Sequence, residues 1–357
     1  CTNWLHSSIN KRIKLIMAFT TIPKSTDYFD TSIWTGNSTS RLIPLDFEPS
    51  FVWGKARSVA TQHALFDAVR GATGRIKSDT NGAEVPNSGV TAFNSNGFTN
   101  GTSDSLNQNG QTFASWSWKA NGQGSSNTDG TINSTYTSAN TTSGFSIVQY
   151  TGNGTAGATV GHGLGAAVKT IIIKKYNTSS DWVYGSSGMG FTKYMNLNST
   201  GAESAYAGMF NDTAPTSSVF TLGADGQVNT NGGTYIAYCF AEVKGFSKMG
   251  SYEGNGNANG IFQYLGFKPS FVLIKNTTAT EAWFLYDNKR GYNGSMAALF
   301  PDEAAADAFA NNIDFLSNGF KIRTAGAILN GNTTKYIYMA FAAAPLVGTN
   351  NVPANAR

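Results

Sequence analysis

A short hydrophobic segment that ends in lysine occurs three times in this chain of 357 residues, at positions 51–55, 170–174 and 271–275. A second apolar segment follows each copy, at positions 113–118, 235–240 and 336–341. Internal repetition of this kind indicates that one structural unit is built several times over. The sequence therefore predicts three tandem modules of roughly 100 residues each, a size sufficient for a sandwich core.

The spacing within the copies keeps one register. Counting 16 residues from the first position reaches Asp67, Ser186 and Asp287, and counting 20 reaches Gly71, Gly190 and Gly291. A glycine at the same place in all three copies is typical of a turn that needs a positive φ angle. Gly-Asn pairs also precede each copy, at positions 36–37, 152–153 and 254–255, and such pairs favour tight turns.

The periodicity is that of β-strands with apolar residues on both faces, which is typical of strands covered on two sides. We expect an all-β protein of three tandem antiparallel β-sandwich modules, jelly-roll or lectin-like in type. The expected divisions are an N-terminal arm (1–27), module one (28–142), module two (143–245), module three (246–345) and a C-terminal tail (346–357).

Three segments need separate predictions. Residues 60–70 could form a helix, but their register with residues 282–287 favours a strand. Residues 301–312 are predicted to be helical, with Pro301 in the first turn and two acids near the positive end of the helix dipole. Residues 121–143, rich in Gly, Ser, Thr and Asn, predict either a surface hairpin or, as we favour, a linker with a strand near 132–136.

Composition narrows the class of protein. Charged residues make up only 13% of the chain, against about 25% in an average globular protein, and there are 40 glycines. This bias is typical of extracellular or virion β-proteins. The net charge of +4 falls to +1 without Lys11, Arg12 and Lys14. No basic stripe with interleaved aromatics and no run of 18 apolar residues occurs, so neither nucleic-acid binding nor membrane insertion is expected.

The start of the chain and the two cysteines carry separate expectations. Residues 1–16 resemble no part of the repeat, and we expect translation to start at Met17 or these residues to be disordered. Cys1 and Cys239 are not expected to form a disulfide, because Cys239 lies within a predicted strand and is better explained as a buried, inert thiol.

No residue set predicts catalysis, a metal or a cofactor. His63 occupies the repeat position of Trp182 and Trp283, so we interpret it as a packed aromatic rather than a ligand. Asp67 with Arg70, repeated as Asp287 with Arg290, could bind a ligand, but a local ion pair that steadies a turn is the preferred interpretation.

One carboxylate per copy recurs, as Glu84 and Glu203, with Glu303 near the same place in the third copy. A single carboxylate lacks the partner that glycosidase chemistry needs. Ligand binding has better candidates in Trp34, Trp116 and Trp118, because sugar faces stack on indole rings. The alternative, which we favour, is that these tryptophans fill a core.

Several motifs together resemble a known type of protein. They are residues 17–29, Trp34-Thr35-Gly36-Asn37, and the runs at 47–53, 65–71 and 95–98. They resemble repeated β-domains of unknown function in virion structural or tail-appendage proteins of tailed phages, especially marine ones. The resemblance covers about residues 17–357 and is weaker in the second copy, where the Asp and Arg of the turn are absent.

The resemblance implies a non-enzymatic virion structural protein, located in the phage particle as part of a tail fibre or other appendage that presents a host-surface or glycan-binding face. Other virion proteins would be its partners, and trimeric phage appendages suggest a homotrimer. We expect weak binding strengthened by avidity. Two alternatives stay open: a secreted bacterial adhesin or carbohydrate-binding module array, and, as the lesser one, a polysaccharide depolymerase.

Overall fold

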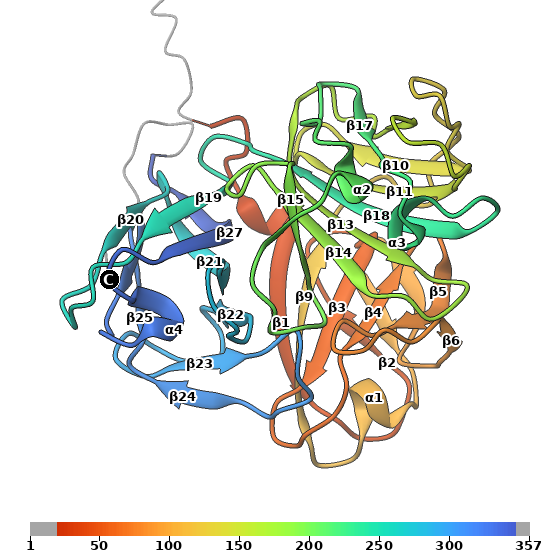
Figure 1. The fold of residues 1–357 in the computed structure, drawn as a ribbon. Helices are drawn as coiled ribbons and strands as arrows, with labels where there is room; N and C mark the ends of the chain where they lie inside the picture. The colour runs from red at the N-terminus through yellow and green to blue at the C-terminus, as the bar shows by residue number, and fades with distance from the viewer. Residues whose placement is uncertain (1–19, 348–357) are drawn as a thin grey trace, which may run out of the picture.

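A computed structural model of the chain describes residues 20–347 (Figure 1). Antiparallel strands dominate, and six sheets combine into three sandwich-like units. The prediction of an all-β protein built from antiparallel sandwich modules is confirmed. Below, the first, second and third modules denote the units that contain residues 51–55, 170–174 and 271–275.

Each module has one large sheet with the same strand order. In the first module it is β1 (Phe29–Thr35), β9 (Thr112–Trp118), β3 (Phe51–Ala56), β4 (Ala64–Asp67), β5 (Gly71–Ile76) and β6 (Val85–Pro86). In the second it is β11 (Phe145–Thr151), β18 (Thr234–Ala241), β13 (Val168–Lys175), β14 (Trp182–Ser186), β15 (Lys193–Asn196) and β16 (Ser204–Ala205), with β10 (Tyr136–Asn140) added outside β11. In the third it is β19 (Ser247–Glu253), β27 (Lys335–Pro345), β21 (Phe267–Asn276), β22 (Phe284–Asp287), β23 (Met296–Leu299) and β24 (Ala308–Ala310).

A smaller sheet accompanies each large one. The first module has β2 (Arg41–Pro44), β8 (Gly97–Asn100) and β7 (Val90–Asn94). The second has β12 (Thr159–Gly161) and β17 (Val219–Thr221). The third has β20 (Phe262–Tyr264), β26 (Gly319–Ile322) and β25 (Ile313–Leu316).

The repeat seen in the sequence is a repeat of pairing register. Phe51 pairs with Asp67, Thr170 with Ser186 and Phe271 with Asp287. On the other side, the same three residues pair with Trp118, Phe240 and Phe341. The expectation that residues 51, 170 and 271 lie on equivalent strands is therefore confirmed.

The three modules pack around one shared core and are not separate domains joined by linkers. The rings of Trp118, Phe240 and Phe341 contact one another, with centroids 5.6–6.2 Å apart. All three side chains are at most 1% exposed. Aromatic rings at these separations pack favourably edge to face. This central triad, one residue from each module, joins the modules into a closed unit.

Buried lysines link the three modules in a ring. Lys55 donates to the carbonyl oxygen of Ala304 (3.2 Å), Lys174 to that of Asn81 (2.9 Å) and Lys275 to that of Thr200 (3.1 Å). Each bond runs from one module to another, and together they link first to third, second to first and third to second. Burial lowers the pKa of each of these lysines to about 8.

A buried asparagine organises the entry turn of each module. The helices α1 (Asp104–Asn107), α3 (Gly226–Asn229) and α4 (Ala327–Asn330) each end in such a residue. The side-chain oxygens of Asn107, Asn229 and Asn330 accept from the backbone N–H of the Asn in the entry Gly-Asn pair. These one-turn helices were not predicted, because four residues are too few to show a helical period.

Residues 301–312 are not helical, contrary to the prediction. Asp302 accepts a hydrogen bond from the backbone N–H of Trp283 (3.0 Å), and β24 pairs with β23. The equivalent residues Asp79 and Asn198 accept from His63 and Trp182 in the same way. The acidic residue therefore completes the repeated module instead of lying at a helix N-terminus.

Two other segment predictions can be compared with the structure. Residues 64–67 form β4, in agreement with the strand chosen for that region. In the region rich in Gly, Ser, Thr and Asn, the strand is β10, slightly later than the predicted 132–136, and it forms a hairpin with β11 of the second module. Ile132 makes only an isolated bridge to Val160.

Residues 1–19 and 348–357 lie outside the described residues, and so do the expectations about Cys1 and about a start at Met17. Within residues 20–347, no helix has the length and apolar character needed to cross a membrane.

Candidate binding cleft on the third module

The turn after the Asp–Arg pair is longer in the third module than in the others. Leu65 pairs with Ile76 and Tyr184 with Met195, in both cases eleven residues later. Leu285 instead pairs with Leu299, fourteen residues later. The three additional residues lie in the segment 291–295, called the long turn below. Tyr292 in this turn is 73% exposed, the highest value for a large hydrophobic side chain within residues 20–347.

The long turn is held in one conformation. The backbone N–H of Ser295 donates to the Tyr292 carbonyl (2.8 Å), and Gly294 has a φ of +96°, which glycine adopts without strain. The side-chain amide of Asn293 donates to the Phe315 carbonyl (3.0 Å) and accepts from the Phe315 N–H (2.8 Å). Both the N–H and the oxygen of the Asn293 side-chain amide thus bind the long turn to β25, and Tyr292 lies in an ordered position.

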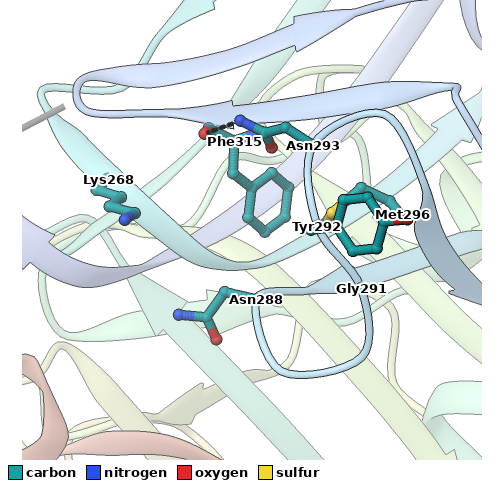
Figure 2. Close-up of a pocket in the computed structure, with 7 residues that line it drawn as sticks. All are labelled: Lys268, Asn288, Gly291, Tyr292, Asn293, Met296 and Phe315. Atoms are coloured by element: carbon teal, nitrogen blue, oxygen red, sulfur yellow. Dashed lines mark hydrogen bonds between the residues drawn. The ribbon is translucent and has the colours of Figure 1, made fainter. Parts of the chain in front are cut away.

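Beside the long turn is a cleft of about 350 Å³, called the tyrosine cleft (Figure 2). It is lined by Lys268, Asn288, Gly291, Tyr292, Asn293, Met296 and Phe315. Figure 2 shows Phe315 between Lys268 and Tyr292, with Asn288 at the lower edge in this view. An aromatic ring, an apolar floor and amide groups at the rim form a surface suited to a polar ligand that has an apolar face.

The charge of the tyrosine cleft comes from one lysine. Lys268 is the single ionisable group with a full charge in its lining. Asp314, an acid tied to the long turn, accepts from the Gly294 N–H (3.1 Å) and lies 3.3 Å from the Arg323 guanidinium. Asp314 is thus paired with Arg323, and the charged side chain in the lining of the cleft is that of Lys268.

The tryptophans proposed as ligand platforms have different positions. Trp116 and Trp118 are 0% and 1% exposed, so neither has a free face for a sugar, and the core interpretation holds for both. Trp34 is partly exposed, donates to the Leu106 carbonyl (3.0 Å) and stacks on Phe113. The structure does not bring these three residues together into one site.

The Asp–Arg pairs stabilise turns, as the preferred interpretation of the sequence predicted, and they also join modules. Asp67 accepts from the Arg70 Nε (2.7 Å) and from the Tyr238 hydroxyl of the second module (2.8 Å). Asp287 accepts from the Arg290 Nε (2.5 Å) and from the Trp116 indole of the first module (2.9 Å). Both pairs have 0% exposed side chains, so they are not open to a ligand.

Each of these arginines also contacts a second carboxylate, which the sequence did not suggest. Arg70 bonds Glu84, and Arg290 bonds Asp307 (2.6 Å). Asp307, not Glu303, is thus the third-module counterpart of Glu84. In support, the backbone N–H groups of Glu84, Glu203 and Asp307 each donate to a carbonyl of the neighbouring module. The two acids around each arginine thus form part of an interface between modules.

His63 is packed as expected for a residue that replaces tryptophan. The Trp53 indole donates to His63 Nδ1 (2.9 Å), so the ring proton is on Nε2 and is donated to the Phe300 carbonyl (2.9 Å). Burial lowers the pKa of His63 well below its usual value. Trp182 and Trp283 likewise donate to carbonyls of the preceding module.

Cys239 is a free, fully buried thiol whose pKa is raised by burial. Over residues 20–347, no three His, Cys, Asp or Glu side chains come together in a way that could hold a metal ion.

Comparison with known proteins gives a family but no activity. A model for a domain of unknown function (DUF7483) matches residues 24–345. The chain belongs to this family. No curated protein and no solved structure matches the chain. The DUF7483 match runs from residue 24 to the end of β27, so it includes all three modules and the tyrosine cleft.

Proposed function

We propose that this DUF7483 protein is a non-enzymatic structural component of a phage virion, located in a tail fibre or other appendage. Its third module presents the binding face, and the ligand is a glycan on the host surface. Other virion proteins hold it in the particle. The observation that carries the binding role is the ordered, 73% exposed Tyr292 at the tyrosine cleft.

The arrangement favours binding through three physical features. The long turn is fixed by backbone and amide hydrogen bonds, so little conformational entropy is lost when a ligand binds. The Tyr292 ring offers a flat apolar surface, and the amides of Asn288 and Asn293 can exchange hydrogen bonds with hydroxyl groups. The closed ring of modules supplies a rigid support for the turn.

The glycan-binding part is tested with the full chain and isolated host envelopes. Tyr292→Ala is expected to weaken binding about three- to tenfold, because the ring contributes on the order of 1 kcal/mol. Tyr292→Phe should retain most of the binding. Phe309→Ala, which removes an exposed ring (58%) outside the cleft, is the matched control and should leave binding unchanged.

Binding that is equal for Tyr292→Ala and the unchanged chain would contradict the role of the cleft. Release of reducing sugar ends from the envelopes by the full chain would favour a depolymerase instead. The virion part is tested separately, by labelling purified phage particles with an antibody against the chain. Particles that lack the label would exclude a virion component and leave the adhesin alternative.

A further inference from the structure

A second cleft lies close to the first on the third module. Its volume is about 390 Å³, and it is lined by Glu242, Lys244, Gly245, Ser247, Lys248, Tyr264, Leu265 and Gly266. It is called the lysine cleft below. Like the tyrosine cleft, it combines an exposed tyrosine with lysine: Tyr264 is 46% exposed.

The lysine cleft has an ordered cation at an aromatic ring. The Lys248 ammonium donates to the Tyr264 carbonyl (2.9 Å) and lies 5.6 Å from the centre of the Tyr264 ring. A cation in this position is held in place while part of its charge stays available to solvent. The acid in the lining, Glu242, accepts from the Met249 N–H (2.9 Å), which directs one of its oxygens to the backbone.

The two clefts share one corner of the chain. Gly266, in the lysine cleft, and Lys268, in the tyrosine cleft, are two residues apart at the start of β21. Two residues of extended chain span at most about 7 Å. Among residues 20–347, none forms a side-chain hydrogen bond or ion pair with Lys268. A ligand that extends past this corner therefore meets the Tyr264 ring, Lys268 and the Tyr292 ring.

We propose that the two clefts together bind a glycan chain that carries negatively charged groups, either carboxylates or sulfates. The proposal rests on the proposed glycan-binding function and defines its ligand class. Two tyrosine rings stack on sugar faces, and Lys248 and Lys268 attract the charged substituents. A neutral glycan would use the rings and amides but would leave the two lysines without a role.

The test measures binding of the full chain to a sulfated glycan without carboxylates (dextran sulfate), a carboxylated glycan without sulfates (polygalacturonate) and neutral glycans (dextran and mannan) by titration calorimetry. Dextran sulfate or polygalacturonate is expected to bind at least tenfold more tightly than the neutral glycans at low salt. The preferred one of the two identifies the substituent. Binding should weaken as salt increases, because screening reduces the attraction between exposed charges.

Variants locate the charge. Lys268→Gln and Lys248→Gln should each weaken binding of the charged glycan about threefold, and Lys268→Arg should restore it, since exposed ion pairs contribute up to about 1 kcal/mol. Lys335→Gln is the matched control and is expected to have no effect, because Lys335 is in the same module at the opposite end of β27 from Ala344, the residue that pairs with Lys268. Unfolding midpoints check that all variants fold.

The outcomes separate this proposal from the one it rests on. Binding of dextran or mannan that needs Tyr292 but is insensitive to Lys268→Gln and to salt would overturn the charged-ligand class and keep the glycan-binding function. Absence of binding to every glycan would overturn both. Tighter binding of a single-stranded oligodeoxynucleotide than of any glycan, with the same lysine dependence, would overturn this proposal in favour of nucleic acid.

Discussion

The turns that follow the Asp–Arg pairs of the first and third modules share an anchor and differ at the tip. In both, the arginine bonds its aspartate, a second carboxylate and a backbone carbonyl beneath the turn. The anchor is buried and joins two modules. Only the third module adds three residues above it, and they carry the exposed Tyr292. Residues that assemble the ring are thus separate from the exposed residues to which we assign ligand binding.

The second module provides the contrasting anchor. Ser186 and Met189 occupy the positions of Asp287 and Arg290. Met339 of the neighbouring third module occupies the position of Trp116. The backbone contacts persist there: the Glu203 N–H donates to the Thr277 carbonyl (2.9 Å). The carboxylate, guanidinium and indole of the third-module anchor are thus replaced by a neutral serine and two methionines. The same backbone hydrogen bond between modules therefore occurs both with an ionic anchor and with a neutral one.

The largest effect is expected from removing the third module from the ring. A chain of residues 246–345 alone would expose Phe271, Phe341 and Trp283, which are at most 1% exposed in the whole chain. Burial of apolar surface is the main favourable term in folding, so we expect this fragment to be unfolded or aggregated. Circular dichroism and size-exclusion chromatography would show it. A monomeric fragment with cooperative unfolding would mean that the modules are independent.

This expectation also changes how avidity can arise. Avidity between modules of one chain would need an equivalent site on each module, and the long turn is present in the third module only. Avidity, if it contributes to attachment, therefore comes from several copies of the chain in one particle.

The second largest effect is expected from Arg290→Met, which should lower the free energy of unfolding. The Arg290 guanidinium and the carboxylates of Asp287 and Asp307 are at most 6% exposed, so the variant leaves buried acids without their cation. We expect a loss of about 3–5 kcal/mol in the free energy of unfolding, measured with urea. The double variant Asp287→Ser with Arg290→Met reproduces the second-module residues and should lose less than Arg290→Met alone. A loss equal to the sum of the two single variants would contradict the comparison of the anchors.

The dependence of stability on pH tests the lysines that close the ring. Lys55, Lys174 and Lys275 have pKa values of about 8 in the folded chain against the usual 10.5, because they are buried. Between these values the unfolded chain binds more protons, so the free energy of unfolding should rise with pH from about 8 to about 9.5. Nearer pH 10, buried tyrosines such as Tyr252, with raised pKa values, act in the opposite direction.

The control for this pH dependence is Lys275→Met. Removing one of the three titrating groups should reduce the slope, by on the order of 1 kcal/mol per pH unit at most. An unchanged slope would show that these lysines stay protonated in the folded chain.

Some of these features could be read from the sequence, and others could not. The strands were predictable because Asp67, Ser186 and Asp287 keep an ungapped register with their modules. The closure of the ring was not, since repetition does not say whether modules are separate or packed together. The helix predicted at 301–312 failed because the acids there bond Trp283, Arg57 and Arg290, which lie far away in the chain.

The tyrosine cleft was missed although a signal was present. The third copy has three more residues between its turn glycine, Gly291, and Leu299 than the other copies have before the equivalent residues Ile76 and Met195, and Tyr292 lies in this longer segment. The sequence cannot show that Tyr292 is exposed while Trp116 and Trp118 are buried, because exposure depends on contacts between modules. Trp34, Trp116 and Trp118 were candidates for ligand binding, with a core position preferred, whereas the most exposed large aromatic side chain within residues 20–347 is Tyr292.

The most direct test of the account is removal of Tyr292, Asn293 and Gly294, which gives the third turn the length found in the first and second modules. Binding of the full chain to host envelopes and its urea midpoint would be measured on the same preparations. The account predicts that binding falls at least tenfold while the free energy of unfolding changes by less than about 1 kcal/mol, since the anchor below the turn is intact. Unchanged binding by a shortened, stably folded chain would contradict the claim that the third module carries the binding face.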